Sequence, residues 1–351
     1  MSLVLNNYRV DYLDVVKGVC IIWMVLYHIA PEYAICDLTK SAFMPLFFLI
    51  SGMFFKDSYD FNVFVQKKVS TILIPFTFFY LISYVVYYLL KYACPSLLIT
   101  HANGILDVFN QRVLFNGPIW FLLSLFFVNV LLFFICKISD LKLVRLLFCI
   151  LFGVLGFYLG CYEMRLPLFI DVAFSALPFF FFGFLLKNLM IVHHIEKYYY
   201  IKYIILLIVL SGTLVFVHSN HNIGFGMRDN SGSATNLVEY FGLILAETCG
   251  ALFTILLFKY IKRIPIISYA GRYSIIILCL HHLIYRPVKV ILQQILHFEN
   301  AVLSWSTFAV TLTLCLALVP LLVKFFPYVT AQKDIFLAWN DKFNSQGSVA
   351  K

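Results

Sequence analysis

Ten apolar segments follow one another along this chain of 351 residues, and nearly all of its length lies in or between them. Crossing a bilayer as a helix takes about twenty mostly apolar residues. Lipid cannot satisfy the edges of an open sheet, so helices are the expected element. The sequence therefore predicts an all-α, polytopic membrane protein with about ten spans, the second of them short, at 13–30, 42–55, 71–91, 119–136, 146–162, 171–187, 203–218, 238–258, 271–291 and 303–323.

The composition agrees with a membrane protein and argues against a soluble one. Hydrophobic residues make up 62% of the chain and charged residues only 12%, whereas a soluble domain is about a quarter charged. The net charge of +9 would fit a nucleic-acid-binding protein if it formed one patch. The basic residues instead lie between apolar segments, which favours membrane lipid as a partner and excludes nucleic acid.

The distribution of Lys and Arg predicts the orientation of the spans. With ten spans, 19 of the 26 Lys and Arg residues fall in segments on the side of the N-terminus and 7 fall on the other side. Basic residues accumulate in cytoplasmic loops. Both termini are therefore expected in the cytoplasm, with the longest external loops at 92–118 and 219–237. The second of these loops is either a lid over a site or a plain connector.

The chain is expected to form one domain, at 1–330, followed by a short cytoplasmic tail at 331–351 that is partly disordered. Asp11 and Asp14 precede the first apolar run and no small-residue cleavage site follows it, so this run is expected to stay as the first span. The nine cysteines include no CxxC pair and no zinc-like spacing, so no metal is expected. Only Cys36 and Cys94 fall where a disulfide bridge would be feasible.

The first span carries ionisable residues on one face. Lys17 and His28 are eleven residues apart, which places them within about 20° of each other and about 16 Å apart along a helix. Asp14, three residues before Lys17, lies on nearly the same face. Glu32 would orient His28 unless Pro31 ends the helix first. Each residue alone fits an interfacial role, but the shared face favours a polar pathway through the bundle.

The ninth span repeats this arrangement, with Arg272 at its cytoplasmic end and His281 nine residues later, about 13 Å along a continuous helix. His282 follows directly. Paired histidines in an apolar span are difficult to explain without a function. Two other stretches are unusual: Ser51-Gly52, where helices would pack closely or a cofactor arm would pass, and Trp120, which follows a Gly-Pro turn and also fits an aromatic belt.

Together these motifs resemble acyltransferase family 3, the integral membrane acyltransferases that often modify surface sugars. The resemblance rests on Asp14-x-x-Lys17-Gly18 with His28, on the Phe-Phe-Leu-Ile-Ser-Gly stretch at 47–52, on Pro118 to Leu122, and on the helix from Tyr273 to His281. The segment around Trp120 is most similar to the fucose-4-O-acetylase-like branch. The resemblance itself implies ten spans and cytoplasmic termini.

The resemblance also implies roles for individual residues. His28 matches the histidine regarded as catalytic, and Lys17 matches the basic residue of the same motif. Lys67 and Lys68 correspond loosely to a basic pair, although the family's Arg-x-x-Arg is here Lys68 followed by Thr71. The expected donor is acyl-CoA, most often acetyl-CoA, and the expected acceptor is a carbohydrate.

A chemical hypothesis follows from these roles. The phosphates of CoA would be held at the cytoplasmic face by five cations, Lys17, Lys67, Lys68, Arg263 and Arg272. Asp14 would orient the first of them, the pantetheine arm would pass Ser51, and the thioester would reach His28. His28 would act as a general base or carry the acyl group, with Glu32 and His281 as further catalytic residues and Trp120 in the substrate site.

Two other classes of protein fit the same sequence. A transporter or flippase for a lipid-linked or polymeric glycan would also have many spans and polar residues within helices, although no inverted repeat is visible. A sensor or scaffold with a vestigial site is the third reading. Capsule, O-antigen, exopolysaccharide, peptidoglycan and small amines all remain candidate acceptors, and the expected location is the inner membrane of a bacterial cell. The oligomeric state stays open.

Overall fold

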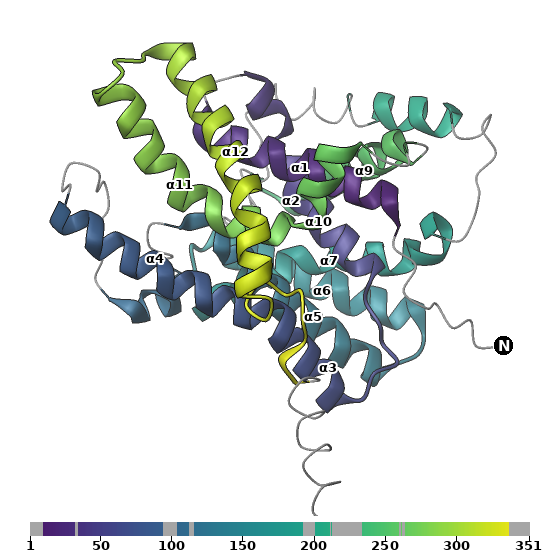
Figure 1. Ribbon diagram of the computed structural model, residues 1–351. Helices are drawn as coiled ribbons and strands as arrows, with labels where there is room; N and C mark the ends of the chain where they lie inside the picture. The colour runs from purple at the N-terminus through teal and green to yellow at the C-terminus, as the bar shows by residue number, and fades with distance from the viewer. Residues whose placement is uncertain are drawn as a thin grey trace, which may run out of the picture.

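The computed structural model describes residues 10–31, 34–93, 104–111, 116–191, 201–210, 212, 234–259, 261 and 264–336. Within these residues the chain is helical and contains no strand. The prediction of an all-α polytopic membrane protein is thereby confirmed. Figure 1 shows α1, α2, α7 and α10 at the centre of the bundle, with α11 and α12 side by side at one edge. The longer elements are α1 (Asp11–Ile29), α2 (Ala34–Met53), α4 (Ile74–Ala93), α5 (Trp120–Ile138), α6 (Lys142–Cys161), α7 (Ile170–Ile191), α9 (Leu237–Phe258), α11 (Ser274–Gln294) and α12 (Asn300–Phe325).

Eight helices in the described part of the chain are long and apolar enough to cross a membrane, and each corresponds to a predicted span. The two other predicted spans coincide with shorter apolar helices at 43–53 and 201–210, so the count of ten stays a prediction. The short second span is only the apolar half of α2, which begins at Ala34. Residues 219–233 of the predicted external loop lie outside the described residues, and so do both termini. The predicted pairing of Cys36 with Cys94 also lies outside the described residues, because the side chains of both cysteines are among those that the structure does not describe.

Short elements connect and interrupt these spans. A π-helical segment, η1 (Val69–Leu73), joins α3 (Phe61–Lys68) to α4 without a break, so this span begins ten residues before the predicted start at 71. The remaining elements are η3 (Ile105–Asn110), η4 (Gly117–Ile119), η5 (Pro167–Phe169) and α10 (Pro265–Arg272). π-Helical turns are rare and occur frequently at functional sites.

The predicted span 271–291 is wrong as a single helix. The structure divides it at Tyr273, whose φ of −108° and ψ of 25° are not helical. α10 packs along α1, whereas α11 packs along α12. The interruption at Tyr273 allows the two consecutive helices to follow different partners. Arg272 therefore ends α10 and does not lie on the helix of His281, so a separation calculated along one continuous axis no longer applies.

Glycines bring the central helices into backbone contact. A Cβ atom added at Gly18 would overlap the carbonyl oxygen of Ile267 in α10, and one added at Gly271 would overlap the carbonyl oxygen of Asp14 in α1. α2 and α7 meet in the same way through Gly52 and Gly183. Because lipid removes the hydrophobic drive for association, close van der Waals packing of small residues holds membrane helices together.

Polar contacts tie together the segments predicted to lie in the cytoplasm. Arg145, buried at the start of α6, contacts Asp57 at 3.4 Å and Asp140 at 3.0 Å. Lys187 donates a hydrogen bond to the carbonyl of Phe55 at 3.2 Å. The segments after α2, before α6 and at the end of α7 therefore meet at one end of the bundle, as the distribution of basic residues requires.

Substitution of Gly18 by Ala should destabilise the protein, because the new Cβ atom has no space against the backbone of α10. Overpacking of this kind costs about 1–3 kcal/mol. Thermal unfolding of the purified protein in detergent measures the effect. Gly104→Ala is the matched control, since a Cβ atom there meets nothing within 4 Å. Equal melting temperatures for the two variants would contradict the close contact of α1 and α10.

Candidate active site

A cavity of about 280 Å³ lies among α1, α2, the α3–η1 junction, α5, α10 and the start of α11. Its wall is mostly apolar, with aromatic and aliphatic side chains such as Met24, Phe47 and Phe121. The polar side chains on the wall are three cations, two serines and one asparagine: Lys17, Lys68, Arg272, Ser51, Ser274 and Asn129. Such a mixture suits an elongated ligand with an anionic end and an uncharged body.

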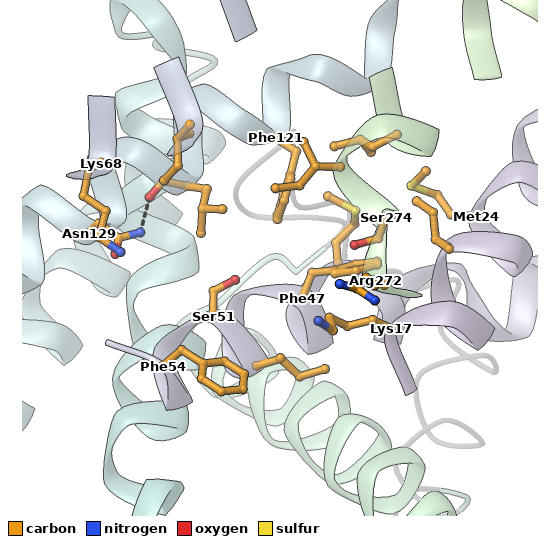
Figure 2. Close-up of a pocket in the computed structure, with 17 residues that line it drawn as sticks. Lys17, Met24, Phe47, Ser51, Phe54, Lys68, Phe121, Asn129, Arg272 and Ser274 are labelled. Carbon is orange, nitrogen blue, oxygen red and sulfur yellow. Dashed lines mark hydrogen bonds between the residues drawn. The ribbon is translucent and has the colours of Figure 1, made fainter. Parts of the chain in front are cut away.

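The cations stand on opposite walls of this cavity. Figure 2 shows Lys17 and Arg272 together on one side, Lys68 with Asn129 on the other, and Ser51 between them. Lys17 pairs with the buried carboxylate of Asp14 at 2.9 Å, which holds its side chain in place. Lys68 and Arg272 add two further positive charges. The three cations together outweigh the Asp14 carboxylate, so the charge around the cavity is positive and favours the binding of an anion.

The face of α1 that lines the cavity continues to His28. Lys17, Ile21 and Met24 line the wall at successive turns, and His28 comes four residues, or about 6 Å, after Met24. On α11, Leu278 lines the wall and His281 follows within one turn. On both helices the residues that line the cavity are therefore followed, about one turn later, by histidines that do not line it themselves.

The histidines of α1 and α11 form one cluster. The ring centroid of His28 lies 5.3 Å from that of His281 and 4.8 Å from that of His282. His281 is fully buried, and its Nδ1 lies 3.0 Å from the carbonyl oxygen of Ile277. That carbonyl only accepts, so Nδ1 carries the proton and Nε2 offers its lone pair. His28, the most accessible of the three, therefore has an imidazole acceptor beside it.

The structure distinguishes the predicted donor-site residues. Lys17, Lys68, Ser51 and Arg272 line one cavity, and Asp14 touches it through Lys17. Lys67 does not line it. Its Nζ instead donates a hydrogen bond to the Tyr59 hydroxyl at 2.9 Å and lies 4.1 Å from the centre of that ring.

The positive charge of Lys67 affects the pKa of Tyr59. Burial alone would raise the pKa of Tyr59, but the hydrogen bonds and positive charges of Lys67 and Lys56 together outweigh burial, so the pKa lies below its ordinary value. Lys67 therefore serves the loop between α2 and α3. Of the two lysines that correspond to the family's basic pair, Lys68 lines the cavity and Lys67 does not.

Three other predicted site residues do not line the cavity or lie outside the described residues. Trp120 does not line the cavity; its ring lies 6.0 Å from that of Phe169 and 6.3 Å from that of Phe121. Glu32 lies outside the described residues, and so does Arg263. The helix α1 ends at Ile29, before Pro31.

Two residues to which the sequence assigned no role in the site belong to this region, Asn129 and His282, of which only the second was noted, as a member of the histidine pair. Asn129 is buried in α5 at the cavity, where its Nδ2 donates to the carbonyl of Leu125 at 2.7 Å. Its Oδ1 has no hydrogen-bond partner among the described residues. His282 joins the cluster through α11. An isolated Asn within an apolar span is the signal that would have identified the first, since buried polar groups are costly.

A buried asparagine positions the loop beside His282. Asn116 donates hydrogen bonds to the carbonyl of Cys279 at 2.7 Å and to the Ser83 hydroxyl at 3.2 Å. The next residue, Gly117, faces the ring of His282: a Cβ atom there would lie 3.7 Å from its Cε1. Asn116 thus fixes η4 against both α4 and α11.

Substitution of Asn116 by Ala should lower the stability of the protein, because it removes two buried hydrogen bonds, to the Cys279 carbonyl and to the Ser83 hydroxyl. The expected loss is about 1–3 kcal/mol. Thermal unfolding in detergent tests this, with Asn110→Ala as the control because Asn110 is exposed at the end of η3. A melting temperature for Asn116→Ala equal to that of the control would argue against this anchoring role.

One comparison with known proteins places the chain in a family. A family profile described as an acyltransferase domain, that of acyltransferase family 3, matches residues 10–322. No curated protein and no solved structure matches the chain. The profile does not separate branches of the family, so the similarity to the fucose-4-O-acetylase-like branch stays a prediction.

Proposed function

Because the chain belongs to acyltransferase family 3 and is a membrane acyltransferase, we propose that it transfers an acetyl group from acetyl-CoA to a hydroxyl of a cell-surface carbohydrate or of its lipid-linked precursor. The observation that carries this proposal is a cavity lined by Lys17, Lys68 and Arg272, with the cluster around His28 about one turn beyond its lining residues on α1 and α11. We place the enzyme in the inner membrane of a bacterial cell.

The cavity suits part of the proposed donor. Small-molecule sites measure about 300–1,000 Å³, and this one is about 280 Å³. It would hold the pantetheine arm and the acyl group, while the nucleotide stays at the cationic mouth in contact with water. Phosphate oxygens accept hydrogen bonds from Lys17, Lys68 and Arg272 there, and Ser51 lies beside the arm.

The unpartnered Oδ1 of Asn129 gives the arm a further contact. Pantetheine contains two amide N–H groups, and a buried amide donor needs an acceptor. Asn129 lies on the same wall as Lys68 (Figure 2). A donor whose phosphates contact Lys68 would therefore pass within reach of Asn129.

The proposed chemistry uses His28 as a general base. An acceptor hydroxyl gives its proton to the imidazole as its oxygen attacks the thioester carbonyl. The carbon–sulfur bond then breaks, and the CoA thiolate takes the proton from the imidazolium. His281 would support this role if the His28 imidazolium turned a ring N–H toward its Nε2, which has no hydrogen-bond partner among the described residues. Transfer of the acyl group to His28 and then to the acceptor is the alternative route.

Replacement of His28 by Ala should lower the rate of acetyl transfer by about 10²–10⁴-fold, the range for general acid–base catalysis. The measurement is acetylation of surface polysaccharide in cells lacking the native gene, and acetyl transfer by purified protein. His297→Asn is the control, since His297 is exposed, lies in the loop after α11 and has a φ of 52° that Asn tolerates.

Full activity of His28→Ala in a correctly inserted protein would contradict the catalytic assignment. Glycan that is moved across the membrane but carries no acetyl group would instead favour a transporter.

The adjacent lysines provide a second test. Lys68→Met should raise KM for acetyl-CoA about tenfold or more, because hydrogen bonds to charged groups contribute about 1.5–3 kcal/mol and each 1.4 kcal/mol is tenfold. Lys67→Met removes the same charge one residue earlier but outside the cavity, and should leave KM near that of the wild type. Equal effects of the two substitutions would show that general charge, and not the cavity, attracts the donor.

A further inference from the structure

Three of the four histidines in the described part of the chain meet at one point. His28 comes from α1, and His281 and His282 come from α11. One ring nitrogen of each lies within 4.8 Å of the corresponding atoms of the other two. The rings of His281 and His282 are buried, whereas His28 is partly accessible, so the cluster has an open side.

His281 makes the second-nitrogen contact that metal-binding histidines usually make. Metal-binding histidines almost always donate their second ring N–H to a carbonyl or carboxylate, which fixes the tautomer and the ring orientation. His281 makes this contact through Nδ1, 3.0 Å from the carbonyl oxygen of Ile277. Its Nε2 is buried and has no hydrogen-bond partner among the described residues. A buried lone pair without a partner is costly, and a cation would satisfy it.

We propose that His28, His281 and His282 bind one Zn²⁺ ion, and that this ion inhibits acyl transfer by occupying the imidazole of His28. Three imidazoles with an open fourth position are an established ligand set for zinc. Tetrahedral bonds of about 2.0–2.1 Å bring ligand nitrogens to about 3.3 Å from one another. In this structure the three ligand atoms lie within 4.8 Å of one another. Rotation of the rings would bring them to the separation that a bound ion requires.

Inhibition follows from the base role of His28, and this part rests on the proposed function. A general base needs a free lone pair, and a zinc ligand has given that lone pair to the metal. Binding of the ion and proton transfer by the same imidazole are therefore mutually exclusive. The spacing of residues in the sequence cannot indicate this site, since its ligands lie about 250 residues apart, on two helices that meet only in the fold.

The first experiment measures metal binding by the purified full-length protein in detergent, stripped with a chelator and titrated with Zn²⁺. We expect one ion per chain, with affinity lowered by more than about 100-fold in His281→Asn and in His282→Gln, because even the outer partners of ligands contribute about 10–100-fold. His297→Asn should bind like the wild type. Equal affinity in all four proteins would overturn the site.

Co²⁺ in the unaltered protein gives a second readout that does not depend on the folding of variants. Four-coordinate cobalt with nitrogen ligands absorbs visible light strongly, whereas the hydrated six-coordinate ion absorbs weakly. An intense spectrum that Zn²⁺ displaces supports the site. The weak spectrum of the hydrated ion would overturn it.

The final measurement is acetyl transfer at increasing Zn²⁺. Activity should fall over the concentration range in which the ion binds, and a chelator should restore it. Activity that requires the bound ion would overturn the inhibitory role. Protein that binds zinc at the three histidines but transfers no acyl group under any condition would overturn the proposed function and leave the metal site intact.

Discussion

The contact between the backbones of α1 and α10 is the interaction on which the site depends. Gly18 and Gly271 allow the two helices to approach until the carbonyl oxygens of Ile267 and Asp14 fill the space of missing side chains. This contact brings Lys17, near the start of α1, to the same cavity wall as Arg272, at the end of α10. Cations within a membrane domain are costly. Here the cost is limited by Asp14, by partial exposure and by a shared opening toward an anionic ligand.

The same contact accounts for the interruption at Tyr273. α10 stays with α1, while α11 packs with α12 and carries its histidines toward the far end of α1. A continuous helix could not lie along both partners. The result is an apolar cavity with Met24, Phe121 and Leu278 on its walls, three cations among its lining residues, and the imidazoles about one turn beyond it on α1 and α11. A donor with a charged nucleotide and a long uncharged arm matches this order of surfaces.

The parts of this arrangement that depend on local spacing were predictable from the sequence. The apolar spans follow from length and composition, and the shared face of Lys17 and His28 follows from the geometry of one helix. The sequence also singled out Ser51-Gly52, and the structure places Ser51 at the cavity wall and Gly52 in close contact with α7, while the passage of a cofactor arm there stays a prediction.

The parts that depend on how helices meet were not predictable. Lys67 and Lys68 are neighbours in the sequence, and only the packing of the α3–η1 span decides which one reaches the cavity. The histidine cluster joins residues about 250 positions apart. The contact of Trp120 with Phe169 on η5 likewise comes from tertiary packing, and Trp120 does not line the cavity.

The central claim is that the cavity carries an acyl donor with its acyl group toward His28. Photoaffinity labelling with an acyl-CoA whose acyl chain bears a photoreactive group tests it most directly, with the labelled residues located by peptide mass spectrometry. The account predicts labels on α1 between Met24 and His28 and on α11 between Leu278 and His282, suppressed by excess acetyl-CoA. Labels confined to the outer surfaces of α6 and α12, or unaffected by acetyl-CoA, would contradict it.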